Sequence, residues 1–367
     1  MINLGVYVSA SKVVEKTTGV GKHSIGMIKS LCKNKEVNLI LFGSYEVLNN
    51  PFFLFKSLKF YSLPYKTRFL ELSWKVINWP KIDNYIPNVD AIYVPGEELV
   101  SSQKYNIFFT IHDTYNFLQN PKNLRKLMLK HSYRLYLKKV CNILTVSHFS
   151  KKKISELFLQ PKNKITVLGN SVGFDDENLK LIKKNNKKIF EKYITIGGPL
   201  NEKKGGEHII NLCSYIESKD KDINIYIIGG IDKVFIDVFK NAELKRTKIF
   251  GHAELSEVKI IELLYNSICY LQLSNVEGFG ITVIEAMHLG TPVIINEIPS
   301  LIENTNGSAI CCNNKNIAFI AEEINKFKND KDYRDKIVNL GYRNASKYTW
   351  DRFSKILISL IKKTISI

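Results

Sequence analysis

Two glutamates, Glu277 and Glu285, stand eight residues apart in a glycine-rich stretch. The stretch covers residues 275–292 and reads NVEGFGITVIEAMHLGTP. Gly278 and Gly280 permit a tight loop whose backbone can approach a ligand closely, and the ITVIEAMHL run after it predicts a short helix. The first N–H groups of such a helix, together with its dipole, attract anions, and phosphate above all.

The two carboxylates flank this predicted anion site. Ionised carboxylates accept hydrogen bonds from paired hydroxyls, so the pattern suits a ligand with a central diphosphate and hydroxyl-rich rings at both ends. A nucleotide sugar has this form. The alternative is a surface glutamate followed by an ordinary glutamate on a helix. The glycines and the apolar run ICYLQL before them favour the binding site.

At these residues the sequence resembles the Glu-x7-Glu signature of retaining GT-B glycosyltransferases, family 4. In that signature EGFG precedes a helix that carries EA, and G-x-P-V follows. The matching residues are Glu277, Gly278, Phe279, Gly280, Glu285, Ala286, Gly290, Pro292 and Val293. The resemblance implies an α/β protein of the GT-B fold, with two Rossmann-like domains that face each other across a cleft and a C-terminal helix that crosses back to the N-terminal domain.

The chain carries 53 Lys and Arg against 35 Asp and Glu, a formal charge of +18. Residues 1–170 hold 25 of these cations and 10 of the anions, and residues 171–367 hold the remaining 28 and 25. The base composition of an AT-rich genome would raise the lysine content in both halves of the chain. The asymmetry between the halves therefore favours a functional origin for part of the positive charge. Nucleic acid, an anionic membrane surface or a phosphorylated substrate could each be the partner.

Length and composition predict about two globular domains in the 367 residues. The chain starts with the apolar run INLGVYV and shows no signal-peptide pattern, and no apolar run reaches the ~20 residues that span a bilayer. The six cysteines lack metal-ligand spacing and are expected to be reduced thiols. We therefore expect a cytoplasmic protein, with a peripheral position on the inner face of the plasma membrane as a further expectation.

Alternating strand and helix patterns predict two α/β domains. Residues 1–172 are expected to form a Rossmann-like acceptor-binding domain, to which a helix of residues 350–367 returns. Residues 173–190 are polar and predict a linker. Residues 191–349 are expected to form the nucleotide-sugar-binding domain, with the strands YITIGG, INIYIIGG, KIFGH, ICYLQL, PVIIN and GSAICC. The acceptor and donor assignments are implied by the resemblance.

In the first domain a glycine loop follows the first strand, and we expect a helix from Lys22. A dinucleotide fingerprint fits poorly, because the three-glycine spacing is absent and no acidic residue ends the next strand. The resemblance instead implies that Gly19 and Gly21 lie near the donor diphosphate. The strand NIFFTIHD ends in His112 and Asp113 at an edge where α/β proteins bind ligands.

A lone histidine at the end of a strand is often structural. The resemblance nevertheless implies that His112 faces the donor sugar and diphosphate, and we assign Asp113 to the acceptor. KITVLGNSV, with Asn170, corresponds to the family's I-x-V-x-x-NGV and ends the N-terminal domain.

Residues 121–140 predict a basic amphipathic helix. Its apolar side is formed by Leu124, Leu127, Met128, His131, Leu135 and Val140, and its cations are Lys122, Arg125, Lys126, Lys130, Arg134 and Lys138. With the lysines that follow, residues 121–153 could lie on an anionic membrane. The alternative is the solvated face of a helix packed on the core. Aromatic residues and lysines over 50–90 allow an RNA surface or an acceptor-binding subdomain, and the resemblance favours the latter.

In the second domain, GGPLNEKKGG resembles the phosphate-contacting GR-x4-KG element. Lys204 is the implied phosphate contact, and Pro199 replaces the arginine expected there, so Lys203 or a residue of the other domain is a candidate substitute. Gly251 and His252 fall where the family binds the nucleobase. The implied catalytic residues are Glu277, His112 and Lys204. The implied donor-binding residues are Gly19, Gly21, Gly198, Lys203, Gly251, His252, Gly278, Phe279, Gly280, Ile281 and Glu285.

The resemblance implies transfer of a sugar, with retention, from a nucleotide-diphosphate sugar to a hydroxyl of a glycan, lipid-linked for many relatives, in lipopolysaccharide or capsule synthesis. Glu277 would orient the sugar and Glu285 would hold the ribose. No metal is implied, because the chain offers no credible DxD beside a strand. No cofactor or nucleic acid is expected either. A sugar-nucleotide epimerase, a glycoside hydrolase and a basic RNA-binding protein are the alternatives.

Overall fold

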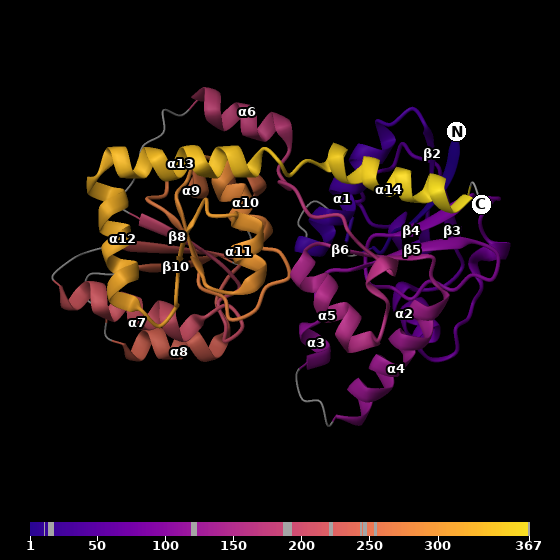
Figure 1. Ribbon diagram of the computed structural model, residues 1–367, viewed down its shortest axis with the longest axis horizontal. Coiled ribbons are helices and arrows are strands. Elements are labelled where there is room, and N and C mark those ends of the chain that lie inside the picture. Colours follow the sequence, from indigo (N-terminus) through magenta and orange to yellow (C-terminus); the bar gives the residue numbers. More distant parts are fainter. Residues whose placement is uncertain are drawn as a thin grey trace. The chain divides into compact units, whose positions relative to one another are not determined.

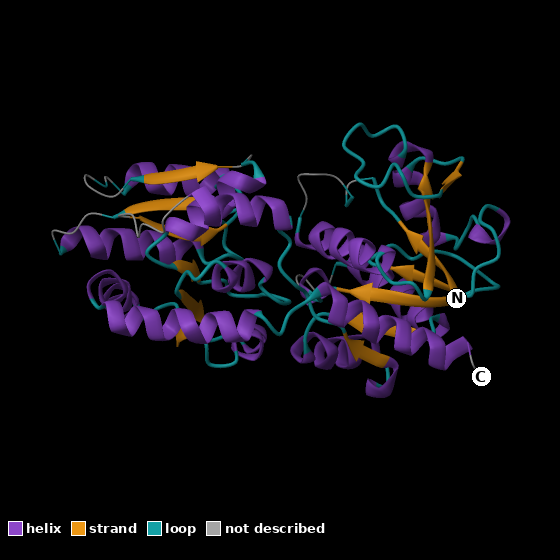
Figure 2. Cartoon of the chain, turned by 90° about the horizontal axis from the view of Figure 1, so that it is seen from above, coloured by secondary structure: helices purple, strands orange, loops and turns teal. Residues whose placement is uncertain are grey.

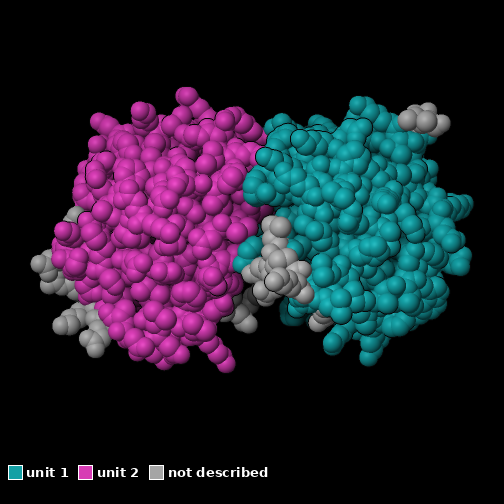
Figure 3. Space-filling model, turned by 60° about the horizontal axis from the view of Figure 1, so that its bottom comes forward, with its two compact units in different colours: residues 1–170, 349–367 teal, residues 171–348 magenta. Residues whose placement is uncertain are grey.

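The computed structural model describes residues 1–10, 12–13, 18–118, 123–185, 193–219, 223–242, 244, 248–252 and 255–365. They form two compact units (Figures 1 and 3). The first unit contains residues 1–170 and 349–367, and the second contains residues 171–348. Each is an α/β unit built on a parallel sheet, which confirms the predicted fold class.

The described strands of the first unit form a seven-stranded parallel sheet in the order β3-β2-β1-β4-β5-β6-β7. Their bounds are β1 (Ile2–Tyr7), β2 (Val37–Ser44), β3 (Phe60–Leu63), β4 (Ala91–Val94), β5 (Asn106–Ile111), β6 (Asn142–Thr145) and β7 (Ile165–Val167). The apolar runs of the central strands are buried, as parallel strands covered on both faces require. The strand order reverses between β1 and β4, and open α/β sheets bind ligands at the carboxyl ends of the strands beside such a reversal.

The helices of the first unit cover both faces of this sheet. They are α1 (Gly19–Cys32), α2 (Thr67–Val76), α3 (Tyr115–Leu118), α4 (Leu124–Lys139), α5 (His148–Phe158) and α14 (Trp350–Ile365), with the 3₁₀ turns η1 (Tyr45–Val47), η2 (Ile82–Asn84) and η3 (Lys162–Lys164). α1 packs against α14 on one face, and α4 packs against α2 and α5 on the other (Figure 1). Gly26 makes the first contact possible, because a Cβ there would collide with the Trp350 ring. The C-terminal helix thus belongs to the first unit, as predicted.

Helix α1 begins earlier than predicted. Gly19 and Gly21 lie in its first turn instead of in a loop before Lys22. The N–H of Lys22 donates to the carbonyl of Thr18 (2.8 Å), which closes this turn. Glycine has a low helix propensity, so the two glycines suggested a loop where tertiary packing permits a helix.

The second unit has a parallel sheet in the order β10-β9-β8-β11-β12-β13. Its strands are β8 (Tyr193–Gly197), β9 (Asn224–Ile228), β10 (Ile249–His252), β11 (Tyr270–Gln272), β12 (Val293–Asn296) and β13 (Ile310–Cys312), all at the predicted places. β8 pairs with β11, with Thr195 opposite Tyr270, and the strand order reverses between these two strands. The buried core around them includes Ile194, Ile225, Leu271 and Ile294.

Helices also cover this sheet on both sides, as Figure 2 shows. They are α6 (Asp176–Asn185), α7 (Gly206–Ser218), α8 (Lys233–Asn241), α9 (Glu257–Asn266), α10 (Ile281–His288), α11 (Pro299–Thr305), α12 (Ile317–Asn329) and α13 (Lys331–Ala345). α7 and α8 lie on one side, and α9 and α13 on the other (Figure 1).

The predicted linker of residues 173–190 contains α6 instead of an open segment. α6 packs on α9, and the Asn178 side chain donates to Glu257 Oε1 (2.8 Å). The segment is mostly polar, but α6 has a short apolar face in which Leu179 and Ile182 are buried. This face is too short to stand out in the sequence. The last residues of the predicted linker lie outside those described.

Candidate functional site

The Glu277 loop follows β11 at the carboxyl edge of the second sheet. Two side chains of α11 hold its carbonyls: Ser300 Oγ donates to the Glu277 carbonyl (2.6 Å), and Asn304 Nδ2 donates to the Phe279 carbonyl (2.8 Å). A trans peptide unit points its N–H away from its own C=O. The N–H groups that follow these two carbonyls therefore face away from α11.

This loop ends at Gly280, whose φ of +85° lies in the left-handed region that favours glycine. Gly280 is also the N-cap of α10. The backbone N–H groups of Phe279, Gly280 and Ile281 donate to no acceptor within the described residues. Donors of this kind at the positive end of a helix dipole favour an anion.

Glu277 and Lys204, which the sequence predicted separately, form an ion pair next to these N–H groups. Glu277 Oε1 also accepts hydrogen bonds from Gln272 Nε2 and Ser274 Oγ, each at 2.9 Å. The Glu277 side chain is 11% exposed and that of Lys204 is 22% exposed. The pair is therefore sheltered but still reaches the surface.

Gly205 places Lys204 at this edge. It has a φ of +76° and is the N-cap of α7, and a Cβ there would collide with the carbonyl oxygen of Leu273. The N–H of Asn275 also donates to the Lys203 carbonyl (2.9 Å). The loops after β8 and β11 are thus held together at the point where the strand order reverses, which is where open α/β sheets bind ligands.

A buried polar chain on β11 supports Glu277, and the sequence analysis missed it. Tyr270 donates its hydroxyl to Gln272 Oε1, and Gln272 Nε2 donates to Ser274 Oγ as well as to Glu277. Gly197 leaves room for this chain, because a Cβ there would collide with the Tyr270 hydroxyl. The alternate polar positions in the apolar strand ICYLQLS were the signal that could have revealed it.

Glu285 lies in the second turn of α10 and is completely buried. Its Oε1 accepts a hydrogen bond from the N–H of Gly173 (3.1 Å). The structure thus places this carboxylate against the start of the second unit. Its contact with a ribose stays a prediction.

The other predicted donor-binding residues of this unit are more scattered. Gly198 follows β8, and its N–H donates to the Ile228 carbonyl (2.6 Å). This N–H is therefore already used in a hydrogen bond between the ends of β8 and β9. Gly251 is exposed on β10, which β9 separates from β8. The side chain of His252 lies outside the described residues. A base-binding role for these two positions stays a prediction.

In the first unit, His112 and Asp113 follow β5 at the carboxyl edge, as predicted. His112 Nε2 is bonded to the carbonyl of Pro95 (2.8 Å), and a carbonyl only accepts, so Nε2 carries the proton. Burial lowers the pKa of His112 to about 4, so the ring is neutral at pH 7. Asp113 Oδ1 accepts the N–H of Tyr115 (3.0 Å).

Three charged residues beside His112 were not predicted. Lys12 forms an ion pair with Glu98 (2.5 Å), a side chain with only 4% exposure. Glu97 Oε1 accepts the N–H of His112 (3.1 Å), and burial together with the nearby Asp113 raises the pKa of Glu97 to about 7. Both glutamates come shortly after the strand AIYV, separated from it by Pro95 and Gly96. The position at a strand end that singled out His112 could therefore have singled them out too.

His23 joins this region from α1. Its Nδ1 is 2.6 Å from Asn170 Oδ1 and its Nε2 is 2.8 Å from the Tyr93 hydroxyl. Burial lowers the pKa of His23 to about 3. Its ring packs edge-on against that of His112, with centroids 4.8 Å apart. Two neutral histidines therefore line the interior beside the strand ends of this unit.

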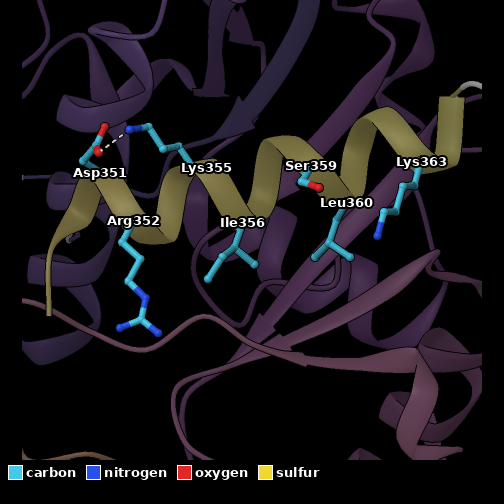
Figure 4. Close-up of a pocket in the computed structure, with 7 residues that line it drawn as sticks. All are labelled: Asp351, Arg352, Lys355, Ile356, Ser359, Leu360 and Lys363. Atoms are coloured by element: carbon cyan, nitrogen blue, oxygen red, sulfur yellow. Dashed lines mark ion pairs between the residues drawn. The ribbon is translucent and has the colours of Figure 1, made fainter. Parts of the chain in front are cut away.

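Two hollows of the described structure do not coincide with the predicted site residues. One, of about 550 Å³, runs along α14 and is lined by Asp351, Arg352, Lys355, Ile356, Ser359, Leu360 and Lys363 (Figure 4). Its lining comes from a single helix, and Asp351 and Lys355 pair with each other (2.7 Å). Another, of about 500 Å³, lies between α7 and α12. Polar groups from several elements converge at Glu277 instead, so we take that position as the candidate site.

Within the described part of the chain, no three His, Cys, Asp or Glu side chains are grouped so as to hold a metal ion. None of the described helices combines the length and the apolar character that crossing a membrane requires.

Two Rossmann-like units, each with a reversal in its strand order, define the GT-B class of fold. The structure resembles that of Anabaena HepE, solved in complex with UDP and glucose, with a TM-score of 0.69 and 13% identity over 99% of this chain and 100% of that one. At this level of identity the likeness concerns the fold alone.

Residues 177–344 match the model of the family described as glycosyl transferases group 1. An uncharacterized 41.2 kDa protein in the cps region of Klebsiella pneumoniae is 28% identical over 56% of each chain. The O-antigen chain mannosyltransferase RfbU of Salmonella typhimurium is 27% identical over 61% of this chain and 64% of its own. The chain thus matches less than two thirds of the length of these relatives.

Proposed function

We propose that this protein is a retaining, metal-independent glycosyltransferase. It moves a sugar from a nucleotide-diphosphate sugar to a hydroxyl of a lipid-linked glycan during synthesis of a bacterial surface polysaccharide. The observation that carries the proposal is the Lys204–Glu277 pair beside the N–H groups of residues 279–281 at the β8/β11 reversal. The family match and a relative named as an O-antigen chain mannosyltransferase support the same activity.

Charge development on the leaving group explains how this site would act. When the bond between sugar and phosphate breaks, the nucleoside diphosphate gains negative charge. The fixed N–H groups and the Lys204 ammonium stabilise that charge without reorganising, and such preorganised donors are worth about 10²–10³ in rate each. They also supply the positive charge that a divalent cation supplies elsewhere, so the proposal requires no metal.

Glu277 accepts hydrogen bonds from the transferred sugar and orients its ring. Its three present donors hold the carboxylate in place. His112 presents a neutral Nδ1 acceptor, since its Nε2 proton is used by Pro95. Lys204 holds the leaving diphosphate. The acceptor hydroxyl attacks from the side on which the diphosphate departs and gives its proton to an oxygen of the departing phosphate, which retains the configuration.

The direct test is Glu277→Gln, assayed with nucleoside-diphosphate sugars in the presence and absence of a glycan acceptor. We expect kcat/KM to fall by about 10²–10³ because the amide is a weaker acceptor for sugar hydroxyls. Glu262→Gln is the control, since Glu262 is a half-exposed glutamate of the same unit that pairs with Lys259. Full activity of Glu277→Gln would refute the assignment, and an altered sugar nucleotide released without acceptor would identify an epimerase.

Two further readouts address the finer parts of the proposal. The anomeric configuration of the product, read by NMR, distinguishes retention from inversion, and activity that survives EDTA distinguishes metal independence. The donor base is found from thermal shifts with UDP, GDP, ADP, TDP and CMP. A ligand at 100 times its Kd stabilises the folded protein by about 2.7 kcal/mol, which gives a readable shift.

A further inference from the structure

Helix α4 has two apolar sides, and only one of them packs in the core. The buried side is formed by Tyr133, Tyr136 and Leu137, with Val140 just after the helix. The exposed side contains Leu124, Leu127, Met128 and Leu135, and Leu124 is 72% exposed. Of the six residues predicted to form the apolar side, Val140 alone is buried, so that stripe does not serve the core.

Helix α2 presents a second exposed stripe. Phe69, Leu72 and Val76 follow one another at helical spacing on its outer side, and Val76 is 71% exposed. Ile77 and Trp79 extend the stripe beyond the helix. α2 packs against α4 (Figure 1). The two stripes therefore belong to neighbouring helices on one side of the sheet, and monomeric proteins rarely expose so many large apolar residues without a partner.

The charges around these stripes indicate which kind of partner fits them. α4 contains no Asp or Glu, and its cations include Lys126, Lys130, Arg134, Lys138 and Lys139. The first unit as a whole has 29 Lys and Arg against 11 Asp and Glu. A surface that combines apolar side chains with cations suits an anionic lipid bilayer. The apolar side chains enter the boundary of the acyl chains, and the cations bind the anionic headgroups.

Other partners match these features less well. A second copy of the chain would bring cations of α4 against cations, because the helix offers no carboxylate to pair with them. RNA binding uses aromatic rings for stacking, whereas the stripes consist mainly of Leu, Val, Ile and Met.

We propose that the exposed residues of α2 and α4, together with Ile77 and Trp79, form a surface that inserts into the headgroup region of an anionic bilayer. Residues 121–153 then act with α2 rather than alone. Trp79 lies at the membrane–water interface, where tryptophan is favoured. This surface does not depend on the activity proposed above, because lipid binding is measured without a sugar donor.

Flotation of the full chain with vesicles of phosphatidylcholine, alone or mixed with phosphatidylglycerol, tests the proposal. We expect binding to the anionic vesicles at ~0.05 M NaCl that weakens at ~0.5 M. Leu72→Ser with Val76→Ser, and Leu127→Ser with Met128→Ser, should each reduce the partition coefficient about tenfold or more. Val234→Ser with Val238→Ser on α8 is the matched control, because both valines are exposed in the second unit, and it should change binding less than about twofold.

Trp79 fluorescence gives a readout that does not depend on those variants. Its emission should shift to the blue on addition of anionic vesicles, and the shift should vanish in Trp79→Phe. Absence of binding to anionic vesicles, equal losses in the control variant, or an unshifted Trp79 would each overturn the proposal. So would a dimer dissociated by the serine substitutions, or RNA binding lost in them, because another partner would then occupy the surface.

Discussion

The two units share the strand order of six parallel strands, to which β7 adds a seventh in the first unit. They differ in charge and in the residues around the position where the strand order reverses. The first has 29 Lys and Arg against 11 Asp and Glu, a formal charge of +18, and the second has 24 against 24. Each carries a Lys–Glu ion pair where its strand order reverses: Lys12–Glu98 after β1 and β4, and Lys204–Glu277 after β8 and β11. The fold thus brings the residues that follow these two strands together in both units.

The surroundings of each pair then decide its chemistry. Lys204 and Glu277 border backbone donors at a helix N-terminus, an arrangement for an anion. Lys12 and Glu98 lie beside Glu97, Asp113 and two neutral histidines, where an anion would meet carboxylates. The second unit therefore offers donors suited to an anion at this position, whereas the first offers carboxylate and imidazole acceptors.

The largest effect that distinguishes the two pairs is expected from removing their lysines. Lys204→Ala should lower kcat/KM by about 10³ and abolish the thermal shift given by the nucleoside diphosphate that the wild type binds. Lys12→Ala should keep that shift. It should instead lower the free energy of unfolding by about 3 kcal/mol, because the buried carboxylate of Glu98 loses its counter-charge.

Urea unfolding of both variants, with and without the nucleotide, separates the two outcomes. A Lys12→Ala protein that no longer responds to nucleotide would show that the first unit also holds the diphosphate. Lys259→Ala serves as a control for loss of an exposed lysine, since Lys259 pairs with Glu262 on α9.

The sequence predicted the second unit better than the first. Its six strands are short apolar runs, and Glu277 and Lys204 stand in motifs with fixed spacing. That the two form an ion pair was not predictable, because it depends on Gly205 bringing the loops of β8 and β11 together. The sequence also gave no sign that Gly173 would bond Glu285.

In the first unit, the sequence analysis assigned no helix within residues 50–90, where α2 buries only Leu70, Ser73 and Trp74. The prediction for residues 121–140 found the apolar stripe of α4 and could not say which of its two apolar sides enters the core. Both sides have helical spacing, so the choice rests on packing against α2 and α5. Glu97 and Glu98 were overlooked although they follow a predicted strand, as His112 does.

The pH dependence of stability sharpens the comparison at Glu97. The pKa of this carboxyl is raised to about 7 from an ordinary value of 4.5. Between these pH values the folded protein keeps a proton that the unfolded chain has released, so the free energy of unfolding falls as the pH rises through this window. Glu97→Gln removes this effect. The free energy of unfolding of the variant minus that of wild type should therefore increase by about 1–3 kcal/mol between pH 5 and pH 8.

Urea unfolding at several pH values measures this difference. His23 and His112 also titrate on unfolding, but they do so in both proteins and cancel in the difference. Glu156→Gln, at an exposed glutamate of the same unit, is the control for loss of a carboxylate. If the stabilities of Glu97→Gln and wild type stayed parallel over this range, the carboxyl would be solvated like an exposed one, and the contrast between the two strand-end environments would weaken.

The smallest expected effect concerns the polar chain behind Glu277, which has no counterpart described in the first unit. Gln272→Leu removes the Nε2 donor that Glu277 and Ser274 share, and it leaves the Tyr270 hydroxyl without its acceptor. Because Lys204 and Ser274 still hold Glu277, we expect kcat/KM to fall only about tenfold, mainly through a higher KM for the donor. Loss of a buried hydrogen bond should also cost about 1–3 kcal/mol of stability.

Gln160→Leu provides the comparison, because Gln160 is also buried but donates to the Phe158 carbonyl in the first unit. It should lose a similar amount of stability and keep the donor KM. Tyr270→Phe should give an intermediate KM, since Gln272 then keeps its bonds to Ser274 and Glu277 but loses the hydroxyl that orients it. Equal changes in donor KM for Gln272→Leu and Gln160→Leu would mean that general destabilisation accounts for the loss, and that Glu277 holds its orientation without the chain on β11.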